Sequence, residues 1–368
     1  MFLLAEKILF YLLIFSIPFQ TRIILRSWGI GFNEWNSVFF YFTDGLLVLL
    51  FVFWIFRIKK FQINKYLVLF LLFSGVSILF ASNKDLSIFR FLKLVEFSLL
   101  FLYLQNTKFD FKKASFVLIA SGIFQSFIAL FQFIKQGSIG LSFLGESPLG
   151  LNIPGVATFL DSAGTKFMRA YGTFPHPNLL AVFLFVCIFL LVRVFLEKRF
   201  SLKFFLPIFG ILNLGLILTF SRTVILVYLV SIIIFALKNK RFRIAACGLL
   251  LAAFLIFIFD PLVFSRFASV SGQSADLRIF YIKEFFNNLN LKNFIFGLGV
   301  GNFVPWLMQI RPGLESFIYQ PIHNIYLLIL AESGIFALIS FLLFLFSVFK
   351  KTKFVSCRLL LVSFLIFG

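Results

Sequence analysis

The sequence predicts an all-α fold, a polytopic membrane bundle of about eleven spanning helices that forms a single integral membrane domain over residues 1–368. Two observations predict it. Of the 368 residues, 61% are hydrophobic, including 61 Phe, whereas a soluble domain has roughly half. The apolar residues also gather into runs of about the 20 residues that cross a bilayer.

Each run predicts a helix, because a helix of that length rises about 30 Å, the thickness of the hydrocarbon layer. In chain order the predicted spans are 3–20, 37–56, 65–81, 86–105, 114–134, 176–193, 204–220, 222–237, 244–260, 323–349 and 355–368. Two long polar stretches separate them, 135–174 and 261–322. Within the second, Ala275–Asn288 has an amphipathic pattern that predicts a further helix.

The formal charge of +20 reports topology rather than nucleic-acid binding. If the N-terminus is cytoplasmic, alternate loops lie inside, and every short inside loop is basic, as the positive-inside rule requires. These loops hold Arg57/Lys59/Lys60/Lys65, Lys108/Lys112/Lys113, Arg193/Lys198/Arg199/Lys203, Lys238/Lys240/Arg241/Arg243 and Lys350/Lys351/Lys353/Arg358. We therefore expect a multi-pass protein of the cytoplasmic (inner) membrane, with 135–174 and 261–322 as outer, extracytoplasmic loops.

The sequence gives no sign of a metal site or a cofactor. The three cysteines, Cys187, Cys247 and Cys357, lie in or beside hydrophobic segments and form no ligand or disulfide pattern. The outer loops hold no Asp-x-Asp pair and no cluster of histidine with carboxylates. We expect no metal and no cofactor.

Three spans begin at the outer face, near Pro177, Arg222 and His323. Helix N-termini carry unpaired N–H groups and the positive end of the helix dipole, so together they would favour a phosphate group. Polar residues accompany them, with Arg169 and Asn178 at the first start and Asn324 at the third.

The arginines have two interpretations each. Arg222 is suited to clamp a phosphate with its planar fork of donors, or it extends to lipid headgroups. Arg278 is a second phosphate candidate, or it pairs with Asp276 on a solvated surface. Arg169 has the same two interpretations.

His323 is one of only two histidines, and a neutral imidazole there could take a proton near pH 7. It could instead serve only to satisfy the unpaired backbone groups at the start of a helix. Asn324 and Tyr326 could hold His323 or a sugar hydroxyl. His176 lies between two prolines, which favours a structural turn. Glu332 lies too far along the same helix to pair with His323, so we interpret it as a partner for another helix or a local structural anchor.

Arg90, Lys93 and Glu96 lie at helical spacing in the outer half of one predicted span. They form an internal salt-bridged stripe, or Arg90 and Lys93 line the same anion site.

Several short sequence motifs follow one another in an informative order along the chain. They are Gly172–Phe174 with Pro177–Ala181, Thr219–Thr223, Arg278–Tyr281, Gly297–Phe303, and His323–Leu327 with Glu332–Ile335. Over about residues 165–345 the set resembles the signature region of the O-antigen ligase and O-antigen polymerase superfamily.

The resemblance implies a GT-C-like helical bundle of lipopolysaccharide or other cell-envelope polysaccharide biosynthesis. Such a glycosyltransferase moves a glycan from a polyprenyl (undecaprenyl) diphosphate carrier to a glycan, lipid or protein acceptor outside the membrane, without metal. It assigns catalysis to His323, Arg222 and Arg278. We place Arg169, Asn178, Asn324, Tyr326, Arg90 and Lys93 among the substrate-binding candidates.

Chemistry adds one expectation, inversion at the anomeric carbon by direct displacement of the diphosphate. Two other functions compete with the ligase. A repeat-unit polymerase shares the same blocks, and the sequence does not separate the two. A lipid-linked glycan transporter or flippase would show pseudo-symmetric halves and broken helices at the midplane, and the sequence shows neither.

Overall fold

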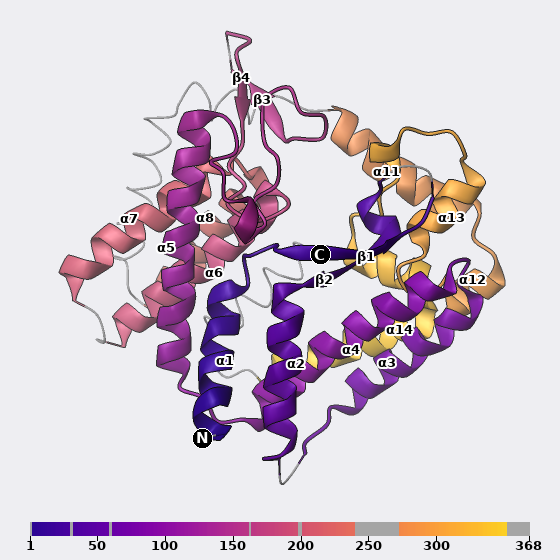
Figure 1. The fold of residues 1–368 in the computed structure, drawn as a ribbon, viewed down its shortest axis with the longest axis horizontal. Helices are drawn as coiled ribbons and strands as arrows, with labels where there is room; N and C mark the ends of the chain where they lie inside the picture. Colours follow the sequence, from indigo (N-terminus) through magenta and orange to yellow (C-terminus); the bar gives the residue numbers. More distant parts are fainter. Residues whose placement is uncertain are drawn as a thin grey trace.

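Residues 2–29, 32–58, 61–161, 163–197, 201–239 and 272–351 are described by the structure, a computed structural model (Figure 1). Its helices are α1 (Phe2–Ser16), α2 (Phe42–Ile55), α3 (Lys65–Ser77), α4 (Lys84–Asn106), α5 (Phe111–Lys135), α6 (Pro177–Leu196), α7 (Leu202–Leu218), α8 (Arg222–Asn239), α11 (Gly272–Asn287), α12 (Leu291–Phe296), α13 (Phe303–Ile310) and α14 (Ile325–Lys351). Short strands are β1 (Arg22–Ser27), β2 (Ser37–Tyr41), β3 (Thr158–Leu160) and β4 (Lys166–Met168).

The mostly helical fold is confirmed. Three helices, α5, α6 and α14, have the length and hydropathy of complete spans, and α2, α3, α7 and α8 are shorter apolar helices. The amphipathic helix predicted at 275–288 is α11. Predicted spans 244–260 and 355–368 lie outside the described residues.

The fold is mostly rather than entirely helical, because two short antiparallel hairpins interrupt the helices within the described residues. Residues 37–41, predicted as the start of a span, form β2 and pair with β1. The turn between them is held by side chains, since Asn33 Oδ1 accepts from the Trp35 and Asn36 N–H groups. The aromatic and β-branched sequence of β2 then suits a strand.

The helices form two groups joined by α1. Helices α5, α6 and α7 pack on one another with α8 against α6, while α14 lies along α3 (Figure 1). Helix α1 contacts both α2 and α5. One apolar core lies within the first group, around Leu184 and Leu212. The second lies among α1, α2, α3, α4 and α14, around Leu50 and Tyr103.

A buried polar network fixes the segment that leads into α6. Gln132 of α5 donates to Gly172 O at 2.8 Å and to Glu146 Oε1 at 2.8 Å, and its own carbonyl accepts from Tyr171 and Gly172. Glu146 also accepts three backbone N–H groups of residues 139–141. Since every polar group in this network has a partner, the chain entering α6 is held firmly to α5.

Helix α14 is broken at Gly334, where φ is 80° and ψ is 178°. A break leaves carbonyls without intrahelical partners. The glycine-rich loop 297–303 supplies N–H donors for these carbonyls. Leu298 N donates to Ala331 O at 2.8 Å, and Gly299 N donates to Glu332 O at 2.9 Å.

The Glu332 carboxylate completes the junction. It accepts from Gly301 N at 2.7 Å and from Phe303 N at 3.3 Å, at the first residue of α13. A carboxylate at a helix N-terminus is favoured by the helix dipole. The interpretation of Glu332 as a structural anchor is confirmed.

We predict that Gly334→Ala destabilises the protein by about 1–3 kcal/mol or more, because its backbone conformation is one that essentially only glycine adopts. A Cβ there would also lie 2.1 Å from Ile295 O. A fall in the thermal unfolding midpoint in detergent would measure the effect.

The matched control is Gly210→Ala in α7, where a Cβ meets nothing within 4 Å. Alanine is the better helix former, so this variant should unfold at the same temperature or above it. Equal behaviour of the two variants would contradict the strained break.

Candidate functional site

One side of the site is built on α6 and α8. Arg169 is buried, and its Nε donates to Thr219 O at 2.7 Å while its Nη2 donates to Asn178 Oδ1 at 2.6 Å. Ser221 Oγ donates to the same Asn178 oxygen at 3.0 Å. Asn178 therefore ties the loop before α6 to the start of α8, where Arg222 is the first helical residue.

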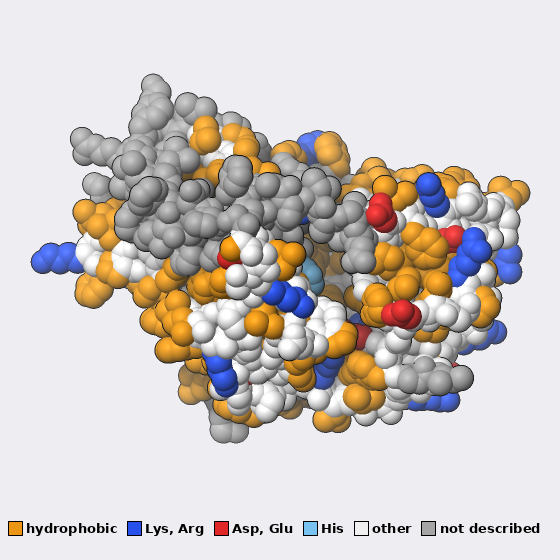
Figure 2. All heavy atoms as spheres, turned by 90° about the horizontal axis from the view of Figure 1, so that it is seen from above, with side chains coloured by type: hydrophobic (Ala, Val, Ile, Leu, Met, Phe, Trp, Pro, Cys, Tyr) orange, Lys and Arg blue, Asp and Glu red, His pale blue; other side chains and the backbone are white. Residues whose placement is uncertain are grey.

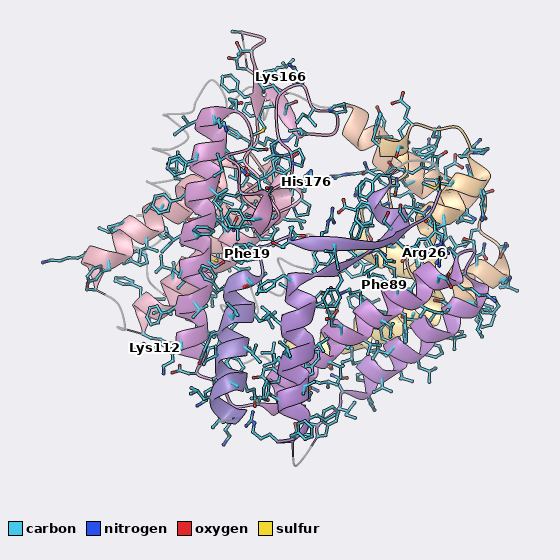
Figure 3. The ribbon with its side chains drawn as sticks, viewed as in Figure 1. Phe19, Arg26, Phe89, Lys112, Lys166 and His176 are labelled. Carbon is cyan, nitrogen blue, oxygen red and sulfur yellow. The ribbon has the colours of Figure 1, made fainter. Side chains whose placement is uncertain are left out.

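His176 caps α6 in the same loop. Its Nδ1 accepts from Asn178 N at 3.1 Å, so the neutral ring carries its proton on Nε2. The ring lies 6.3 Å from that of Tyr171, in a T-shaped arrangement. Figure 3 places His176 at the inner edge of the α5–α8 group, away from Lys112.

The other side of the site is built on α11 and α14. The His323 ring meets Tyr281 of α11 in a T-shaped contact at 5.8 Å, and its Nε2 lies 3.1 Å from Gln320 Oε1. Tyr281 is fully buried and donates to Ile318 O at 2.7 Å, which fixes the surface against which His323 stands. Asn324 caps α14, with its Oδ1 accepting from Leu327 N at 3.0 Å.

The charges on the two sides affect one another. Removal of water by the surrounding protein is the largest cause of a fall in the pKa of His176 to about 4, followed by the nearby charges of Arg169, His323 and Arg278. The pKa of His323 is also lowered, by the same loss of water and then by Arg278. Both rings keep some solvent access, and both shifts favour the neutral imidazole.

The surface view agrees with this arrangement. Figure 2 shows a histidine side chain in a hollow near the middle of the face that is turned up in Figure 1, with basic side chains beside it. A histidine and basic side chains thus lie beside one depression. Such a place can bind an anionic group and accept a proton in the same complex.

Three other predicted residues, Arg90, Lys93 and Tyr326, have partners of their own. Arg90 donates to three carbonyls, those of Glu34, Trp35 and Ser37, at 3.1–3.3 Å. Lys93 pairs with Asp44 and with Glu96, so a salt-bridged stripe is present. Tyr326 packs beside Phe341, with ring centroids 6.5 Å apart. Their substrate-binding roles stay predictions.

Two neighbours of His323 were missed from the sequence. Tyr281 stood on the apolar side of the predicted amphipathic helix, which signalled burial but not its histidine partner. Gln320 lies in an irregular segment and no pattern marks it. Among the residues that the structure describes, no three His, Cys, Asp or Glu side chains gather as a metal site would need.

Residues 204–342 match the family model described as O-antigen ligase. This segment is similar to the O-antigen ligase family. The resemblance to the O-antigen ligase superfamily is confirmed, and the matched segment contains Arg222, Arg278, the glycine-rich loop, His323 and Glu332. Neither a curated protein nor a solved structure matches the chain.

At the level of the superfamily, this match points to ligase- or polymerase-type glycan processing on a lipid-linked substrate. The apolar helices agree with an integral membrane protein. Arg169 and His176, on the other side of the hollow, precede the matched segment.

We predict that Arg278→Gln raises the pKa of both His323 and His176, because a nearby positive charge opposes protonation and its removal relieves that cost. Since the chain has two histidines, side-chain NMR titration can follow both directly. Lys283→Gln, an exposed cation on the same helix, should leave both pKa values in place. Unchanged pKa values of both histidines in Arg278→Gln would contradict the nearness of Arg278 to His323 and His176.

Proposed function

We propose that this protein transfers a glycan from a polyprenyl diphosphate carrier to an acceptor hydroxyl at the outer face of the cytoplasmic membrane, as a metal-independent O-antigen ligase. The proposal is supported by the nearness of His323, Arg278 and Arg169 to His176, since their charges lower the pKa of His176 and Arg278 also lowers that of His323, and by the contact of His323 with Tyr281 of α11. The segment similar to the O-antigen ligase family, which contains His323, Arg222 and Arg278, also supports it.

The chemical step is a displacement at the anomeric carbon. The acceptor oxygen forms the new glycosidic bond, the bond from that carbon to the diphosphate oxygen breaks, and the hydroxyl proton passes to His323. A neutral His323 whose Nε2–H donates to Gln320 leaves Nδ1 as the base. Its lowered pKa keeps this lone pair available at neutral pH.

Charge grows on the diphosphate as it leaves. Arg222 and Arg278 are the side chains proposed to stabilise it, because a fixed cation at that oxygen lowers the transition state more than the ground state. Arg169, held by Thr219 and Asn178, keeps a positive charge at the wall of the hollow. With these cations in place, a metal is not needed for leaving-group stabilisation.

Orientation of the site supports its outer location. The basic turn that contains Lys112 lies away from His176 (Figure 3), and short basic loops mark the cytoplasmic side. The hollow would then face outward, where lipid-linked glycans await transfer.

We predict that His323→Ala and Arg222→Ala each lower the rate of glycan transfer by about 10²–10⁴-fold, the range typical of a lost general base or charge stabiliser. Purified protein, a lipid diphosphate donor and a chelator would be used. Lys283→Ala is the matched control and should transfer at the wild-type rate. Full activity in both site variants would place the chemistry elsewhere, and loss of wild-type activity in chelator would contradict metal independence.

We further predict inversion at the anomeric carbon, since a single direct displacement reverses the configuration. NMR of the product formed from a donor of known anomeric configuration measures it. A retained configuration would require a covalent intermediate and overturn the direct displacement. If the acceptor that reacts is another carrier-linked glycan, the product series is a ladder of repeat units and the protein is a polymerase.

A further inference from the structure

The short turn that precedes His323 is held by side chains from three parts of the chain. Its four successive carbonyls each accept a side-chain hydrogen bond: Ser316 O and Tyr319 O from Asn33 Nδ2, at 3.1 and 3.2 Å, Phe317 O from Gln320 Nε2 and Ile318 O from the Tyr281 hydroxyl, both at 2.7 Å. A turn has few backbone hydrogen bonds of its own, so these contacts set its position.

Gln320 determines which ring nitrogen of His323 carries the proton. A backbone carbonyl only accepts, so the end of the Gln320 amide that lies 2.7 Å from Phe317 O is the NH2 group. The other end, 3.1 Å from His323 Nε2, is therefore the oxygen, which cannot donate. A neutral imidazole in this contact has its proton on Nε2 and its lone pair on Nδ1.

The chain between the two side chains leaves them little independent movement. Only Pro321 and Ile322 separate Gln320 from His323. Pro321 has a fixed φ, and Ile322 is buried in the apolar cluster that also contains Tyr281. A displacement of the turn is consequently passed on to the His323 ring.

Asn33 connects this turn to the β1–β2 hairpin, 283 positions earlier in the chain. Asn33 is buried, and both ends of its amide are used, since Oδ1 caps the hairpin turn while Nδ2 reaches the carbonyls of the distant one. Ser316 Oγ adds a second link by donating to Phe32 O at 3.2 Å. The two turns are thus joined in both directions.

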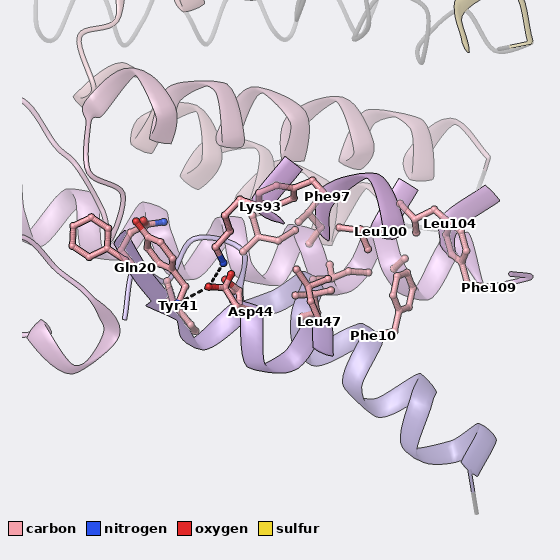
Figure 4. Close-up of a pocket in the computed structure, with 18 of the residues that line it drawn as sticks. Phe10, Gln20, Tyr41, Asp44, Leu47, Lys93, Phe97, Leu100, Leu104 and Phe109 are labelled. Atoms are coloured by element: carbon pink, nitrogen blue, oxygen red, sulfur yellow. Dashed lines mark hydrogen bonds and ion pairs between the residues drawn. The ribbon is translucent and has the colours of Figure 1, made fainter. Parts of the chain in front are cut away.

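The hairpin is itself fixed to α4. Arg90 donates to three carbonyls of residues 34–37, at 3.1–3.3 Å. At the end of β2, Asp44 accepts from Tyr41 N at 2.7 Å and pairs with Lys93, and both contacts are drawn in Figure 4. With these partners the hairpin is a rigid support for the turn before His323.

We propose that Gln320 is a positioning residue that holds His323 with its proton on Nε2, and that Asn33 of the β1–β2 hairpin holds Gln320 in place. This rests on the proposed function, in which His323 takes the acceptor proton. It gives the hairpin, which lies outside the matched residues 204–342, a part in the chemistry without any contact with substrate.

The first test compares two substitutions of Gln320. Gln320→Met removes the acceptor, so NMR of the imidazole nitrogens should show a measurable Nδ1–H form of neutral His323. The kcat for glycan transfer should fall about three- to tenfold, as for one lost hydrogen bond, with the donor KM within about twofold of wild type.

Gln320→Glu is the rescue variant, because it keeps an oxygen for Nε2–H. It should retain the wild-type tautomer and recover kcat at high pH. Its negative charge favours the imidazolium and raises the pKa of His323, so the acid limb of the kcat profile should move to higher pH. His176 is an internal reference, since its Nδ1 accepts from Asn178 N and its proton should stay on Nε2 throughout.

The second test removes the hairpin contact. Asn33→Asp keeps the oxygen that caps the hairpin turn and loses the donors to Ser316 O and Tyr319 O, so it should change His323 as Gln320→Met does. Asn33→Ser also caps a turn without the amide donor. Asn36→Asp is the matched control, because Asn36 is buried in the same turn and donates to Trp28 O instead.

A wild-type tautomer and kcat in Gln320→Met overturn the proposal, and so does a folded Asn33→Asp or Asn33→Ser with an unchanged His323. A change in Asn36→Asp equal to that in Asn33→Asp also overturns it, because general damage to the hairpin would then explain both. The tautomers are measured on the protein without substrate. A wild type that transfers no glycan would therefore refute the proposed function, while the tautomers still test the positioning of His323.

Discussion

The Glu332 carboxylate holds the part of the structure on which the His323 side of the site depends. By accepting from Gly301 and Phe303 it closes the break in α14 and starts α13 at the same point. An unpaired carboxylate in an apolar bundle is costly, so its two N–H partners allow it to stay. Because α14 is broken at Gly334, the direction of its first turns, which follow His323, is set by these contacts and not by the rest of the helix.

The Arg169 and His176 side of the site is positioned by neutral amide side chains instead. Gln132 and Asn178 each join two segments that are distant in sequence, and each has its carbonyl oxygen shared by two donors. Arg169 and His176 are consequently held by short, satisfied contacts rather than by long flexible stems. With both sides rigid, little ordering entropy remains to be lost when a substrate arrives.

Much of the helical fold could be predicted from the sequence, because apolar runs such as 204–220 and 65–81 leave a helix few alternatives in lipid. The β1–β2 hairpin could not, since its turn depends on side-chain contacts of Asn33 that no periodicity reveals. For the site, the family blocks named His323 and the arginines. The contact of His323 with Tyr281, and the ion pair of Lys93 with Asp44, are tertiary and leave no trace in spacing, whereas the pair of Lys93 with Glu96 was predicted from it.

The junction at Gly334 has a consequence for biosynthesis. Residues 297–303 leave the ribosome before Glu332 does, and α3, against which α14 packs, is made far earlier. When the last described helix enters the membrane, the donors for its acidic side chain and the wall for its apolar face already exist. The chain therefore never has to insert this charge ahead of its partners, and the order of translation matches the order in which the bonds can form.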